Sequence, residues 1–107
     1  MKKIIWISFD LGVTGDYEGI YTWLDSWGAV ECGDSFAYIK AYDFRKDLLA
    51  ELREDIKQTV RIDKRTRIYV VREVDGEPKG RFLIGGRKNA PWSGYAPTRE
   101  TGTEDAG

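Results

Sequence analysis

In this 107-residue chain, apolar side chains first recur at every second residue, as in a strand, and then at helical spacing. The same change from strand spacing to helical spacing occurs again later in the chain. Residues 2–10 alternate as a strand does, and residues 16–27 place their apolar side chains at helical spacing. Residues 29–42 predict two short strands around a Gly-Asp pair, and an amphipathic helix follows them. Residues 67–74 predict a strong strand, and residues 81–84 predict a last short strand after an Asp-Gly turn.

This order of elements predicts an α+β fold of the ferredoxin-like, split βαβ kind. The pattern is βαββαβ plus a short C-terminal strand, which gives an antiparallel sheet with two helices on one face. We expect this domain to cover residues 1–87. Residues 88–107 contain two of the three prolines and many Gly, Thr and acidic residues, so they predict a flexible C-terminal tail.

Two aspartates predict where the helices begin. Asp16 precedes the first helix and Asp43 precedes the second, and a carboxylate in this position accepts hydrogen bonds from free helical amides. Phe44 would then begin the apolar stripe of the second helix. The two helices should cover the inward side chains of two strands, which are Ile5, Ile7, Phe9, Ala37, Ile39 and Ala41.

The opposite face of the predicted sheet is aromatic and polar. By alternation, it presents the side chains of Trp6, Ser8, Asp10, Phe36, Tyr38 and Lys40. So much aromatic surface is unusual on a monomer, so either a second copy covers it or unpaired bases stack on it. Because the last strand lacks the aromatic signature of RNA-recognition sheets, we favour a homodimer with Trp6, Phe36 and Tyr38 at its interface.

The composition excludes several kinds of site. The chain has no His and one Cys, so it cannot form a Cys/His zinc site within one chain or use a histidine as general base. The single thiol allows no intramolecular disulfide. No apolar run approaches the length of a membrane span. We therefore expect a cytoplasmic protein without membrane contact.

The charge is unevenly distributed. The formal net charge is −1, yet residues 61–88 hold nine Lys or Arg against four Asp or Glu. A local cationic segment attracts polyanions even when the whole protein is nearly neutral. The candidate nucleic-acid contacts are Arg61, Lys64, Arg65 and Arg67, at the start of a predicted strand, and Lys40 on the aromatic strand. The alternative is that these charges only keep edge strands and turns solvated.

Asp10 is the candidate catalytic and metal-binding residue, because it ends the first strand just before a glycine-containing loop. A carboxylate in that position can bind a divalent ion or orient a water molecule. A single carboxylate is a poor metal site, so a second Asp10 across a two-fold axis would have to complete it. The alternative is that Asp10 accepts hydrogen bonds from loop amides and holds the turn over residues 11–15.

Several segments resemble the CRISPR-associated protein 2 superfamily, and its stand-alone members most closely. The resemblance covers about residues 3–85 and rests on Ile7-Ser-Phe-Asp-Leu11, Gly15-Asp-Tyr17, Trp27-Gly-Ala29, Gly33 to Lys40 and Asp63 to Val71. It implies a ferredoxin-like homodimer whose C-terminal strand crosses to the partner. Asp10 matches the family's proposed metal-binding catalytic aspartate, which is paired across the two-fold axis. Some members are metal-dependent nucleases, and others are non-catalytic adaptors that hold DNA for an integrase.

Three functions stay open at this point. The first is a small homodimeric nucleic-acid-binding protein that contacts DNA or RNA through the basic segment. The second is an endonuclease dependent on Mg²⁺ or Mn²⁺ and centred on paired Asp10 carboxylates. The third is a non-catalytic protein-interaction module, such as an antitoxin-like protein or a defence-associated adaptor. The nearly neutral charge and the acidic first helix favour the third function.

Overall fold

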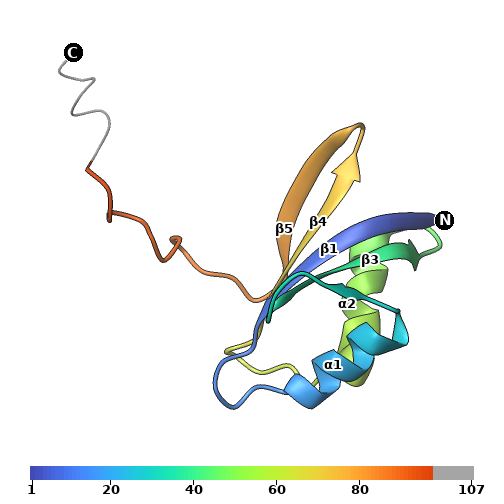
Figure 1. Cartoon of the computed structure of the whole chain (residues 1–107), viewed down its shortest axis with the longest axis horizontal. Helices are drawn as coiled ribbons and strands as arrows, with labels where there is room; N and C mark the ends of the chain where they lie inside the picture. Colours follow the sequence, from blue (N-terminus) through green and yellow to red (C-terminus); the bar gives the residue numbers. More distant parts are fainter. Residues whose placement is uncertain (98–107) are drawn as a thin grey trace.

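The computed structural model describes residues 1–97, which form a five-stranded sheet and two helices (Figure 1). The elements in chain order are β1 (Lys2–Asp10), α1 (Tyr17–Ser26), β2 (Val30–Glu31), β3 (Phe36–Asp43), α2 (Leu48–Thr59), β4 (Arg67–Val74) and β5 (Glu77–Ile84). The order of strands across the sheet is β2-β3-β1-β4-β5, and every neighbouring pair is antiparallel. The predicted α+β class is confirmed, and the arrangement is compatible with a ferredoxin-like fold.

The core lies between the sheet and the two helices, which sit on the same side of it (Figure 1). Ile5, Ile7 and Phe9 of β1 are buried, while the side chains between them are more exposed. The predicted alternation of β1 is therefore confirmed. From the helices, Ile20 and Ile56 are among the fully buried side chains of the same apolar cluster.

The alternation of β3 is broken by a bulge, which the sequence analysis did not predict. Lys3 pairs with Tyr42, but Ile5 pairs with Ile39, so β3 holds one extra residue between these pairs. An extra residue reverses the direction of the side chains that follow it. Tyr42 is therefore buried and Ala41 is exposed, and the prediction that Ala41 faces the helices was wrong.

The first helix begins where predicted and the second does not. Asp16 caps α1 and accepts a hydrogen bond from the Gly19 amide over 2.9 Å. The cap of α2 is Asp47, four residues after the predicted Asp43. Glu51 holds the intervening chain in a non-helical turn, because its carboxylate accepts hydrogen bonds from three consecutive backbone amides of residues 45–47. Phe44 is still buried in the core, from outside the helix.

The last strand is longer than predicted, because β5 covers residues 77–84 and not only 81–84. Pro78 and Gly80 weaken the strand signal, yet both are tolerated at the edge of a sheet. Gly80 has a specific role, since a Cβ there would come within 2.6 Å of the Tyr69 ring. No helix among residues 1–97 is long and apolar enough to cross a membrane.

A glycine pair ends β5 and turns the chain away from the sheet. Gly85 has φ +72°, and a Cβ on it would overlap the carbonyl oxygen of Thr66. The segment that follows leaves the body of the molecule (Figure 1), and Trp92 and Tyr95 on it are largely exposed. The predicted tail extends beyond residue 97, and its part over residues 98–107 lies outside the described residues. The predicted domain boundary after residue 87 stays a prediction.

Candidate functional site

Asp10 and Arg67 face each other at one end of the two central strands. β1 ends at Asp10 and β4 begins at Arg67, and the antiparallel register makes them direct partners. The Arg67 Nη2 atom lies 2.7 Å from Asp10 Oδ2, which is the distance of a charge-assisted hydrogen bond. Both are predicted site residues, but the sequence pattern does not predict their contact.

Two further groups bind the same carboxylate. Arg87, just beyond β5, brings its Nη2 atom to 3.5 Å from Asp10 Oδ2. The Gly12 amide donates to Asp10 Oδ1 over 3.3 Å, as expected if Asp10 has the alternative role of accepting hydrogen bonds from loop amides. The Arg67 hydrogen bond, followed by that of Gly12, holds the pKa of Asp10 below its usual value. Asp10 is therefore ionised at neutral pH and shared between two arginines.

These surroundings do not fit a divalent metal within one chain. In residues 1–97, no three His, Cys, Asp or Glu side chains lie close enough together to hold a metal ion. The side chains nearest to Asp10 are cations, so Mg²⁺ or Mn²⁺ would have to displace Arg67 and stay beside two positive charges. A second carboxylate would have to come from another copy of the chain.

The loop before β4 lies against the loop that follows β1. Asp16 joins the two loops, because its Oδ2 atom accepts the Arg61 amide proton over 2.8 Å. Arg61 also donates through Nη2 to the Thr14 carbonyl oxygen over 3.3 Å. Arg65 packs against Gly12 on the same side. Three predicted contacts, Arg61, Arg65 and Arg67, are thus brought to the end of the sheet that holds Asp10.

The carboxylates near these cations are already engaged. Asp63 accepts hydrogen bonds from the Arg65 amide over 2.8 Å and from the Thr66 hydroxyl, and its pKa is lowered chiefly by the first of these. The pKa of Asp16 is lowered chiefly by the Arg61 amide and then by Gly19. Lys64 and Arg65 are exposed, and neither side chain forms an ion pair within residues 1–97. We call Arg61, Lys64, Arg65, Arg67 and Arg87 together the basic end of the sheet.

Lys40 is not part of the basic end. It lies in the bulged part of β3, opposite the first residues of β1, whereas Asp10 is the last residue of β1. Ile4 and Asp10 are six positions apart along the strand, which corresponds to about 20 Å. One phosphate cannot contact Lys40 and Arg67 at the same time.

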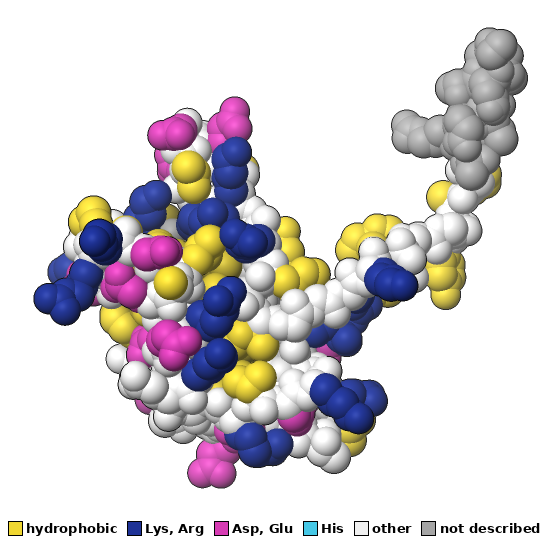
Figure 2. Space-filling model, turned by 180° about the vertical axis from the view of Figure 1, so that it is seen from behind, with side chains coloured by type: hydrophobic (Ala, Val, Ile, Leu, Met, Phe, Trp, Pro, Cys, Tyr) yellow, Lys and Arg dark blue, Asp and Glu magenta, His cyan; other side chains and the backbone are white. Residues whose placement is uncertain are grey.

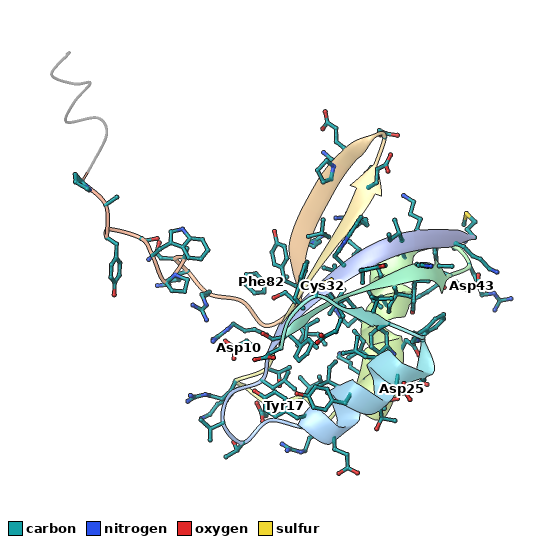
Figure 3. The ribbon with its side chains drawn as sticks, in the orientation of Figure 1. Asp10, Tyr17, Asp25, Cys32, Asp43 and Phe82 are labelled. Atoms are coloured by element: carbon teal, nitrogen blue, oxygen red, sulfur yellow. The ribbon has the colours of Figure 1, made fainter. Side chains whose placement is uncertain are left out.

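A groove opens beside Asp10, between the sheet and the first residues of the tail. Its volume is about 540 Å³, and it is lined by Ser8, Asp10, Arg67, Tyr69, Phe82, Arg87 and residues 89–92. Asp10 and Phe82 lie near the point where the tail leaves the sheet, and Asp43 lies at the other end (Figure 3). No local sequence pattern predicts this groove, because its walls come from strands and a tail that lie far apart in the chain.

The helix-free face carries the predicted interface residues. Phe36 is 38% exposed, and Trp6 and Tyr38, which pair with each other in the β1–β3 register, are partly buried. Figure 2 shows Lys and Arg side chains spread over the visible face of the body, with Asp and Glu among them, and hydrophobic side chains along the tail. Ser8 pairs with Phe36 and with Tyr69, so these aromatic side chains adjoin the groove beside Asp10.

A second cluster surrounds Asp55 of α2. Its Oδ2 atom accepts hydrogen bonds from Trp23 Nε1 (3.1 Å), Trp27 Nε1 (3.1 Å) and Tyr42 Oη (3.2 Å). Burial, followed by the Asp55 charge, raises the pKa of Tyr42. This cluster ties α1, α2 and β3 together on the helical side of the sheet, so it is a structural element and not part of the site at Asp10.

Comparisons with protein-family models, with curated proteins and with solved structures give no significant match to this chain.

Proposed function

We propose that this chain is a homodimeric nucleic-acid-binding protein of ferredoxin-like, split βαβ topology that holds phosphates on its basic end. The observation that carries the proposal is the convergence of Arg67 and Arg87 on one carboxylate, with Arg61, Lys64 and Arg65 on the adjoining loop. Cations held by hydrogen bonds to the protein lose less conformational freedom when they meet a phosphate. Arg61, Arg67 and Arg87 are held in this way. Five cations at one end of a sheet favour a polyanion over a single small anion.

The topology supports this proposal. Strands β2, β3, β1 and β4 lie side by side in the order expected for a split βαβ unit, and β5 extends the sheet beyond β4. The face opposite the helices is then free for a second copy, which would cover Trp6, Phe36 and Tyr38. A homodimer doubles the basic end, and two linked sites bind a long polyanion more tightly than one.

The proposal includes no cleavage step. A metal-dependent nuclease would need Arg67 and Arg87 to leave Asp10 and a second Asp10 to approach it. The role of Asp10 in this proposal is to position the two guanidinium groups, and it is not a catalytic role.

A non-catalytic protein-interaction module is the second candidate. The exposed acidic side chains Glu18 and Asp25 on α1 favour it, because a nucleic acid would avoid that helix. This module would bind a basic protein partner through the acidic α1. The first proposal instead has the basic end bind the phosphates of a nucleic acid.

The test compares two variants of equal charge. The basic-end variant replaces Arg61, Lys64, Arg65 and Arg67 with Ala. The control variant replaces four exposed cations elsewhere with Ala, which are Arg45, Lys46, Lys57 and Arg81. Fluorescence anisotropy with labelled single- and double-stranded DNA and RNA then measures the affinity of each protein.

We expect the basic-end variant to lose most of its affinity and the control variant to keep most of it. Equal losses would mean that only the net charge matters, which contradicts a defined site. If the wild type binds none of these nucleic acids, the interaction module becomes the better proposal.

A further inference from the structure

The groove beside Asp10 has one aromatic side. Tyr69 of β4 and Phe82 of β5 form an edge-to-face pair, with ring centroids 5.0 Å apart and an angle of 89° between the planes. Gly80 leaves room for the Tyr69 ring, since any Cβ there would collide with it. Phe82 is 37% exposed, so the pair still offers ring surface to a ligand. Trp92 of the tail forms a further wall and is 75% exposed.

The other side of the groove is cationic and polar. Arg67 and Arg87 share a single carboxylate oxygen, and each guanidinium has five N–H donors, so most of their donors remain free. Two cations beside one carboxylate leave a net positive charge. Ser8 also lines the groove, and its hydroxyl forms no hydrogen bond within residues 1–97. This side fits an anion with several acceptor oxygens, such as a phosphate.

The dimensions of the groove fit a small ligand. A volume of about 540 Å³ lies within the range of roughly 300–1,000 Å³ that small-molecule sites occupy. A ligand that satisfies both sides must combine a planar ring with a phosphate. A nucleotide has both groups, and only an unpaired nucleotide has its base faces free for protein rings.

We propose that this groove binds one unpaired nucleotide of a single-stranded nucleic acid, with the base between the Tyr69–Phe82 pair and Trp92 and the phosphate on Arg67 and Arg87. Asp10 acts as a positioning residue that keeps the two guanidinium groups together. The inference rests on the proposed function and adds to it a preference for single strands. The groove begins at Ser8, which pairs with Phe36 on one side and with Tyr69 on the other, so it lies next to the Trp6, Phe36 and Tyr38 surface on the same face of the sheet. A second copy that covers that surface would have to leave β4, β5 and the tail open.

The test separates base contacts from phosphate contacts. One probe is a fluorescein-labelled oligothymidylate of eight residues, and the other is an abasic oligonucleotide with the same number of phosphates. The proteins are the full-length wild type, Trp92→Ala, Trp92→Phe and Phe82→Ala. Tyr95→Ala is the matched control, because Tyr95 is an exposed ring on the same tail that does not line the groove.

We expect the wild type to prefer the oligothymidylate by about 5- to 150-fold, which corresponds to the stacking of one base. Trp92→Ala and Phe82→Ala should reduce this preference, whereas Trp92→Phe and Tyr95→Ala should retain most of it. Affinity for the abasic probe should be the same in all five proteins. Because Trp92 is largely exposed, its replacement leaves the core intact and tests the groove even if Phe82→Ala folds poorly.

Base binding in the groove and nucleic-acid binding by the basic end can fail independently. If the wild type binds both probes equally, or if Trp92→Ala keeps the full preference, the groove does not bind a base, although the basic end still binds phosphates. If the wild type binds neither probe nor duplex DNA, the proposed function fails together with this inference.

Discussion

Arg67 holds the carboxylate of Asp10 at 2.7 Å, and this contact joins the first residue of β4 to the last residue of β1. Arg87 approaches the same oxygen from beyond β5, so three segments far apart in the chain meet at one carboxylate. Asp10, the candidate catalytic residue of the sequence, is therefore the ion-pair partner of two arginines. This arrangement favours the proposed binding of phosphate over the binding of a metal ion by a single chain.

Replacing Asp10 by Asn should leave the affinity for nucleic acid in EDTA unchanged or slightly raised. The substitution removes a negative charge that competes with phosphate for Arg67 and Arg87, whereas the Asn side-chain oxygen can still accept their hydrogen bonds and keep them in position. Any metal-dependent cleavage should disappear in the same variant, which a nuclease assay with Mn²⁺ would reveal. Asp25→Asn, on the exposed part of α1, is the control for the change in net charge. A large loss of affinity in EDTA for Asp10→Asn alone would contradict the expectation that the Asp10 charge competes with phosphate.

The chain should form a homodimer through the face that carries Trp6 and Tyr38. Aromatic side chains there have no helix to cover them, and a second copy would remove them from water. Analytical ultracentrifugation at micromolar concentration should give the mass of two chains, and Tyr38→Glu should shift it toward one. Lys40→Glu changes the charge on the same strand without removing an aromatic ring and serves as the comparison. A monomeric wild type at these concentrations would rule out this interface.

Replacing Asp55 by Ala should destabilise the fold strongly. Trp23 and Tyr42 are each 2% exposed, and both would lose their hydrogen-bond acceptor. Each buried donor left without a partner costs about 1–3 kcal/mol, so we expect a total of at least ~2 kcal/mol and a fall in Tm of roughly 10 °C. The neighbouring exposed Glu54→Ala should change stability by about 0.5 kcal/mol or less. Thermal unfolding, followed by circular dichroism, gives the Tm of both variants. If the Tm of Asp55→Ala equals that of Glu54→Ala, the hydrogen bonds to Asp55 do not stabilise this cluster.

Truncation after Lys88 should leave the Tm nearly unchanged. Trp92 and Tyr95 are 75% and 87% exposed, so their removal takes little buried surface from the fold. A loss of ~1 kcal/mol would lower the Tm of a domain of this size by about 4–8 °C, which differential scanning calorimetry resolves easily. A fall of that size would mean that a tail ring docks on the body. The same truncation should remove the preference for single strands.

Regular periodicity predicted most of the fold. The bounds of β1 and β4, the Asp16 cap and the burial of Ile5, Ile7 and Phe9 follow from local patterns, and the structure confirms them. The misses occurred where a tertiary contact overrides the local pattern. The bulge in β3 turns Tyr42 toward Asp55, and the Glu51 carboxylate delays α2 until Asp47, and neither contact is visible in a single window of sequence.

The candidate site was predicted in its residues but not in its geometry. The basic segment pointed to Arg61, Lys64, Arg65 and Arg67, because their clustering is local. Arg67 and Arg87 follow Asp10 in the sequence by 57 and 77 residues. Their convergence on Asp10 depends on how the strands pair in the sheet, which a local periodicity does not determine. Lys40 was also predicted as a nucleic-acid contact. It lies on a predicted strand, but the strand pairing places it far from Asp10, opposite the first residues of β1.

The dependence of nucleic-acid affinity on salt tests the central claim most directly. The wild type and the basic-end variant would be titrated with a DNA duplex over a range of KCl concentrations, and log K plotted against log [KCl]. Each phosphate contact that is lost should make the slope shallower by about one unit, so the variant should lose roughly four units while the Arg45, Lys46, Lys57 and Arg81 control stays close to the wild type. Equal slopes and equal affinities for the wild type and the basic-end variant would contradict the claim that the basic end binds phosphates.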